Sequence, residues 1–174
     1  MIYNYELEQH LLAGLIKHPE TFTEIAPFTT EKDFYSDDTI VNQTIFSVLR
    51  AALNDGDSLD EIVLAQRVQS LGISFEDNIN VTDYIKALSM RKISESGVKK
   101  TAQELKKYTI RREIAESGLN VAKKMKGMQA SSSYDDIIDV ADKSYNGTID
   151  LYETGANIPE NIYDSMEDII EERG

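Results

Sequence analysis

Residues Ser94 to Met128 read SESGVKKTAQELKKYTIRREIAESGLNVAKKMKGM and form the longest helical pattern of the chain. Its apolar residues recur mostly at three- and four-residue intervals, which is typical of an α-helix. These residues are Val98, Ala102, Leu105, Ile110, Ile114, Val121, Met125 and Met128. Ser94 or Ser96 can cap the beginning, and Gly118 costs about 1 kcal/mol relative to alanine without ending the helix. The spacing therefore predicts the longest helix of the chain here.

A second helix follows directly. The three serines at 131–133 are typical of a turn, and Ser133 can cap the helix after it. The apolar residues of this helix are Ile137, Ile138, Ala141 and Tyr145. Two long helices joined by so short a turn form an antiparallel hairpin, which we expect to comprise 96–128 and 133–146.

The C-terminal end combines a predicted linker with a predicted amphipathic helix. Apolar periodicity disappears over 147–158, which contains two glycines, and we expect a flexible linker there. Pro159 suits the first position of a helix, and the residues after it that share one face are Ile162, Met166, Ile169 and Ile170. Six acids and a single arginine occupy the rest of 159–174. So short a helix is marginal alone in water, so we expect it to dock either on its own domain or on a neighbour.

The residues before the hairpin also show helical periodicity and predict a globular helical body over 1–92. Asn4 can cap a first helix that Pro19 ends, and Thr30 can cap a short turn. A further helix begins at Asp37 or Asp38 and ends at the Asn54-Asp55-Gly56 turn. Ser58 and Glu61 have the spacing of a capping box, and Thr82 can cap another helix. The sequence thus predicts an all-α protein with a body (1–92), a hairpin (93–146), a linker (147–158) and a linker helix (159–174).

Composition limits the classes of function. The 174 residues are 41% hydrophobic, contain no cysteine and carry a formal charge of −13, which excludes disulfides and thiol catalysis. No signal peptide or membrane-spanning run is readable, so we expect a cytoplasmic protein without membrane contact. Residues 91–126 hold eleven Lys and Arg against four acids, so this window is +7 and the remainder is −20. The net charge argues against duplex binding, which needs clustered cations.

Catalytic patterns are weak. Gly97-Val98-Lys99-Lys100-Thr101 lacks the first glycine and the preceding strand of a nucleotide-binding loop. His10 and His18 lie near one face of the first helix without a third metal ligand. Glu6 and Glu8, with Glu20 or Glu24, are carboxylates that would ordinarily solvate a helix face. The fragment is therefore predicted to have no catalytic residues, cofactor or metal of its own.

The order of several short motifs resembles the N-terminal domain and linker helix of DnaB-type replicative DNA helicases, whose motor is RecA-like. The motifs are Glu6-x-Glu8-Gln9-x-x-Leu12-x-x-Leu15, Asp33-Phe34-Tyr35, Ile45-Phe46 with Leu49, Asp57 with Val63 and Val68, Tyr108-x-x-Arg111-Arg112-Glu113-Ile114, and Ile158-x-x-x-Ile162 through Ile169-Ile170-Glu171-Glu172-x-Gly174. Where the family often has His-Arg after the Asp-Phe-Tyr, this chain has Asn42-Gln43, and the usual proline before the first helix is missing. Such divergence would suit a helicase encoded by a phage or plasmid.

The resemblance implies a non-catalytic collar. In the family, hairpins pair into dimers, three dimers build a hexamer, and the collar binds primase and in some systems a helicase loader. The linker helix docks on a neighbouring motor domain, so Ile162, Met166, Ile169 and Ile170 are its expected docking residues. ATP, Mg²⁺ and single-stranded DNA would be bound by the motor domain of the full-length protein. The expected partner surface of the hairpin is Lys106, Lys107, Tyr108, Arg111, Arg112, Ile137 and Ile138.

Two other interpretations remain open. A free-standing helical adaptor, such as a helicase loader, would have the same composition but would end naturally at Gly174. A helical hydrolase would use Glu6 or Glu8. We expect Lys106 and Lys107 to be exposed, so reversing their charge should affect partner binding more than stability, because exposed charges contribute little to stability.

Overall fold

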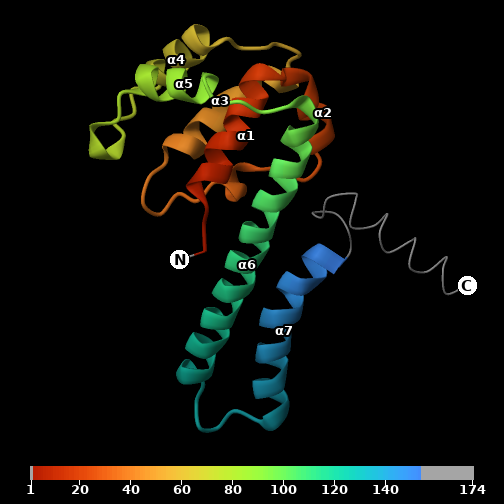
Figure 1. Cartoon of the computed structure of the whole chain (residues 1–174). Coiled ribbons are helices and arrows are strands. Elements are labelled where there is room, and N and C mark those ends of the chain that lie inside the picture. Colours follow the sequence, from red (N-terminus) through yellow and green to blue (C-terminus); the bar gives the residue numbers. More distant parts are fainter. Residues whose placement is uncertain (1, 154–174) are drawn as a thin grey trace, which may run out of the picture. The chain divides into compact units, whose positions relative to one another are not determined.

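The computed structural model describes residues 2–153 (Figure 1). Within this range the ordered elements are all α or 3-10 helices and no strand occurs, which confirms the predicted all-α class. The α-helices are α1 (Tyr5–Lys17), α2 (Phe22–Ile25), α3 (Val41–Asn54), α4 (Glu61–Ser70), α5 (Val81–Ser89), α6 (Glu95–Gly127) and α7 (Tyr134–Glu153). The short 3-10 helices are Pro19–Thr21, Glu31–Asp33 and Glu76–Asn78. The predicted linker helix lies outside the described residues.

The chain divides into two compact units, and the division falls inside α6. The first unit comprises Tyr3–Tyr108, and the second begins at Thr109 and includes Ile2. The first half of α6 belongs to the first unit because Val98 and Leu105 are part of that unit's hydrophobic core. The predicted hairpin helix therefore contributes to both units.

The core of the first unit forms where helices distant in sequence meet. Helix α1 packs against α3 and α5, and α4 packs against the same two helices. The i, i+4 spacing of Leu11 and Leu15 on α1 places both side chains in this core, as predicted. Phe34 stacks on Phe46 of α3, with ring centroids 4.6 Å apart.

A close approach of α1 and α6 explains one glycine. A Cβ atom on Gly14 would lie only 2.7 Å from Cγ2 of Val98. Glycine at this position therefore lets the two helices approach at a distance that alanine would not permit.

The second unit contains an antiparallel hairpin, in which the part of α6 from Thr109 runs beside α7 (Figure 1). Side chains join the helices along their length: Ser117 bonds to Thr148, Lys124 Nζ donates to Ser144 Oγ at 3.0 Å, and the Tyr152 hydroxyl donates to Glu113. The two helices form the predicted antiparallel hairpin, but its second helix extends beyond the predicted end at 146.

Helix α7 is longer than the sequence predicts. The prediction of a linker from 147 is wrong for 147–153, which is helical to Glu153. Thr148 and Tyr152 bond to α6 in this segment, so packing against a neighbour overrides the weak helix propensity of Gly147.

The helix caps show which local signals were sufficient. Asn4, Thr30 and Ser133 cap the elements that follow them, as predicted. The predicted caps at Ser58 and Thr82 are wrong, because Asp60 and Asn80 stand there and accept from backbone N–H groups at 2.8 and 3.1 Å. Helix α3 begins at Val41, later than the predicted Asp37 or Asp38, and has no side-chain cap.

Candidate functional site: helix α6 and the hairpin surface

Lys106 is not a surface residue. Only 5% of it is exposed, and its Nζ lies 3.0 Å from Oδ1 of the buried Asp33. Asp33 is held by the capping box of its own 3-10 helix, in which the backbone N–H of Thr30 donates to Oδ2 at 2.9 Å. The expectation that Lys106 is exposed is therefore wrong, because the sequence could not show that α6 passes over Asp33.

The neighbouring predicted residues divide between the surface and local contacts. Lys107 is exposed and forms an i, i+3 ion pair with Glu104 at 2.9 Å. Tyr108 is half-buried, and its hydroxyl accepts a hydrogen bond from Asn4 Nδ2. Arg111 is exposed, whereas Arg112 donates to the Ile2 carbonyl at 2.9 Å. The basic stretch is thus partly structural and does not form one continuous basic face.

Apolar side chains lie exposed on the hairpin. Ile138 is 66% exposed, and Ile137 is also on the surface, as the prediction of a partner surface requires. The structure adds Tyr134 and Leu151 of α7 and Leu119 of α6 to this set. Sequence reasoning missed Leu151 because it assigned this residue to a linker. These side chains, together with Ile114 of α6 and Tyr145 of α7, form the exposed apolar surface of the hairpin.

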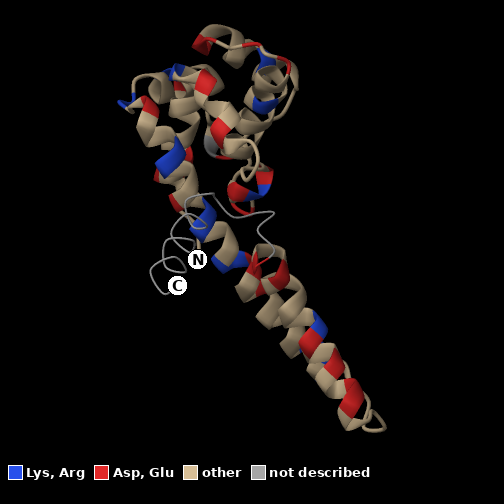
Figure 2. Cartoon of the chain, turned by 90° about the vertical axis from the view of Figure 1, so that its right-hand side faces the viewer, with Lys and Arg blue, Asp and Glu red and all other residues tan. Residues whose placement is uncertain are grey.

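The two helices of the hairpin carry opposite charge. From Thr109 onward α6 has five Lys and Arg against two acids, whereas α7 has six acids and only Lys143. Figure 2 shows both signs along the hairpin. A basic helix beside an acidic one offers complementary charges to another copy or to a protein partner.

The family motif around Glu8 forms a buried hydrogen-bond network. Glu8 is fully buried and accepts from the Tyr35 backbone N–H and from Asn42 Nδ2, each at 3.2 Å. Asn42 in turn accepts from the Tyr84 hydroxyl, which also accepts from Gln9 Nε2 at 3.0 Å. Burial raises the pKa of Tyr84. The expectation that Glu8 solvates a helix face is wrong; it joins α1 to α3 inside the first unit.

Asn42 therefore has a clear role at the position where the resemblance departs from the family pattern. Its amide donates to the carboxylate of Glu8 and accepts from Tyr84 of α5. Gln43 bonds instead to the backbone carbonyl of Glu31, at 3.0 Å. The divergent pair is thus accommodated within the structure of the first unit. The Glu8 carboxylate is enclosed within the first unit, whereas the side chain of Glu6 is 85% exposed.

The two histidines and Gly97, which the sequence offered as weak candidates for metal or nucleotide binding, contact other parts of the first unit. His18 contacts the Ile93 carbonyl at 2.9 Å through Nε2, and burial followed by the nearby Arg91 charge lowers the pKa of His10. Gly97 lies in the first turn of α6, with its N–H donating to Ser94 Oγ at 3.1 Å. Among residues 2–153, His, Asp and Glu do not gather into a group of three that could hold a metal ion. None of the described helices is both long and apolar enough to cross a membrane.

Comparison with known proteins identifies the family. The profile described as "DnaB-like helicase N terminal domain" matches residues 1–107. A solved structure, the crystal structure of the N-terminal domain of DnaB helicase from Mycobacterium tuberculosis, is similar in fold, with a TM-score of 0.70 and 15% identity. The match covers 83% of this chain and 97% of that one. Among curated proteins none matches significantly. The family match extends over more than half of the chain, and its fold agrees: the chain belongs to the DnaB-like helicase N-terminal domain family.

Proposed function

We propose that this chain is the non-catalytic collar and assembly domain of a hexameric replicative DNA helicase. Its hairpin pairs with the hairpin of a second copy, and three such dimers form the collar. The observation that carries the proposal is the exposed apolar surface of the hairpin, on a chain of the DnaB-like helicase N-terminal domain family. Exposed apolar surface of this kind marks protein interfaces.

Partners follow from the same proposal. The collar recruits a primase and, in some systems, a loader through exposed residues such as Lys107 and Arg111. ATP, Mg²⁺ and single-stranded DNA are bound by a motor domain of the full-length protein. The segment 159–174 docks on a neighbouring motor domain through Ile162, Met166, Ile169 and Ile170.

A matched pair of substitutions tests the hairpin interface. Ile138 on α7 and Ile62 on α4 are both 66% exposed, so replacing either by aspartate should change the free energy of unfolding by a similar amount. Ile138→Asp should turn the oligomer into a monomer in light scattering, because it buries a charge in the interface. Ile62→Asp should leave the mass unchanged. A monomeric parent chain at high concentration, or equal masses for the two variants, would contradict the proposal.

The docking of the C-terminal segment is tested separately in the full-length protein. Ile162→Asp or Ile169→Asp should impair ring assembly and the coupling of ATP hydrolysis, while the circular dichroism of the collar is unchanged. Normal ring assembly in both variants would rule out this docking role.

A further inference from the structure

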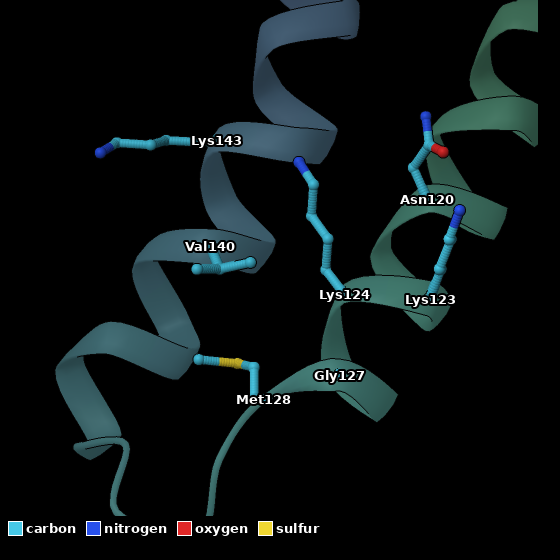
Figure 3. A pocket seen from close by; sticks show the side chains of 7 residues that line it. All are labelled: Asn120, Lys123, Lys124, Gly127, Met128, Val140 and Lys143. Carbon is cyan, nitrogen blue, oxygen red and sulfur yellow. The ribbon is translucent and has the colours of Figure 1, made fainter.

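A groove lies between α6 and α7 near the turn that joins them (Figure 3). It has a volume of about 660 Å³ and is lined by Asn120, Lys123, Lys124, Gly127, Met128, Val140 and Lys143. Figure 3 shows Lys124 and Met128 extending toward α7, whereas the side chain of Lys143 points away from α6. The lining thus combines an apolar floor with three lysines, and none of the lining residues is acidic.

The lysines of the groove have little compensation on α6. Lys124 donates to the neutral hydroxyl of Ser144, and Lys123 has no ion pair within residues 2–153. Lys143 pairs with Asp139 on its own helix at 2.9 Å, which raises the pKa of Lys143. The site is therefore suited to a ligand that is apolar on one side and acidic on the other.

The chain itself contains a segment with this chemistry. Residues 159–174 carry six acids and one arginine, together with Ile162, Met166, Ile169 and Ile170 at helical spacing. The net charge of −5 on residues 159–174 is opposite in sign to that of the groove lysines, and the two adjacent isoleucines are apolar like Val140 and Met128 of the groove. We infer that residues 159–172 of the same chain occupy this groove.

The length of the chain permits this contact. Helix α7 is described as far as Glu153, and the rise from Val140 to that residue is about 20 Å. Five residues, 154–158, can reverse the direction of the chain, as helix connections of this length do. A helix that begins at Pro159 then rises about 17 Å by Ile170. If this helix runs antiparallel to α7, Ile170 comes within about one turn of Val140 along the axis of α7. Ile162 then lies beside Asp150, far from Val140.

This inference concerns a contact within the 174 residues and does not rest on the proposed function. If the segment also docks on a motor domain, the two positions exclude each other, and the groove holds the segment whenever the motor domain does not.

Disulfide trapping tests the contact directly, because the native chain contains no cysteine. The full chain with Val140→Cys and Ile170→Cys should form an intramolecular disulfide at least ten times faster than a control with Val140→Cys and Ile162→Cys. The control uses the same segment and the same groove residue but the wrong register. Equal rates for the two pairs, or a disulfide that joins two copies only, would overturn the inference.

Charge supplies the second readout. Adding Lys123→Glu and Lys124→Glu to the trapping pair should slow disulfide formation by about threefold or more, as expected for the loss of exposed charge pairs. Adding Lys86→Glu and Lys92→Glu, two lysines outside the groove, should leave the rate unchanged. One molar NaCl should slow the parent pair in the same direction. An unchanged rate after reversal at Lys123 and Lys124 would show that the groove lysines do not hold the segment.

Discussion

At the scale of single residues, two ionisable side chains that the sequence places on the surface are buried in the structure, and the reason is the same for both. Lys106 and Glu8 both lie in helical stretches whose pattern does not determine whether these two side chains are buried. In the structure both are buried. The partner of Lys106 is Asp33, and the carboxylate of Glu8 is held by Asn42 and the Tyr35 backbone. Such contacts join residues far apart in sequence. Periodicity alone therefore cannot distinguish a solvated charge from a buried, paired one.

The buried pair makes a clear prediction for stability. Lys106→Met should destabilise the protein by about 3–5 kcal/mol, because it leaves the Asp33 carboxylate buried without its cation. The adjacent Lys107→Met should change the free energy of unfolding by less than about 0.5 kcal/mol, since Lys107 is exposed. Urea denaturation of both variants measures the difference. Similar midpoints for the two would mean that the Lys106–Asp33 pair does not stabilise the fold.

A second prediction concerns pH. Burial and the Arg91 charge lower the pKa of His10 below 6.5. The charged form is disfavoured in the folded protein, so the stabilisation present above pH 6.5 is lost as the pH falls below it. Titration of the His10 ring by NMR should give a midpoint below 6.5, and Arg91→Gln should move it upward. An unchanged midpoint in the Arg91→Gln variant would show that the charge of Arg91 does not lower the pKa of His10.

At the scale of elements, local signals located most helices but not all of their ends. Side-chain caps were recognised at Asn4, Thr30 and Ser133, where a single residue type fits the beginning of the element. Two capping residues compete within a few positions at Ser58 and Asp60, and the structure uses the second. The last turns of α7 could not be foreseen, because their helicity depends on contacts with α6. The exposed surface at Leu151 was missed with them.

The end of α7 should respond to its bond with α6. Tyr152→Phe removes the hydroxyl that donates to Glu113, and amide exchange over 147–153 should become about three to ten times faster, as expected for one lost hydrogen bond. Tyr134→Phe, at a residue that is 87% exposed, serves as the control and should leave exchange unchanged. An equal increase in amide exchange over residues 134–146 and 147–153 would show that the Tyr152–Glu113 hydrogen bond does not act locally on the end of α7.

At the scale of the whole molecule, the net charge of −13 has a different meaning once the fold is known. The fold and the family were predictable because several weak motifs occur in the family's order, and the profile match over residues 1–107 bears this out. The charge still argues against duplex binding, but it also affects how copies of the chain meet. Two acidic molecules repel each other over about a Debye length, so an apolar contact must form against that repulsion.

Salt therefore distinguishes two kinds of interface for the proposed dimer. If the exposed apolar surface of the hairpin dominates, raising NaCl from 0.05 to 0.5 M should strengthen association, because repulsion between the two acidic chains is screened. Sedimentation equilibrium at the two concentrations measures the change. Weaker association in high salt would instead mean that the cations of α6 pair with the acids of α7 across the interface.

The buried Lys106–Asp33 contact also limits which insertions and deletions the gene can tolerate. One added residue between Val98 and Lys106 would turn the following part of α6 by about 100°. Lys106 would then leave Asp33 while Val98 stayed beside Gly14. The same change in the turn at 128–133 would disturb neither contact. Reading-frame-preserving indels should therefore be accepted at the end of the hairpin and rejected where α6 crosses the body, a pattern that a library of single-codon insertions would reveal.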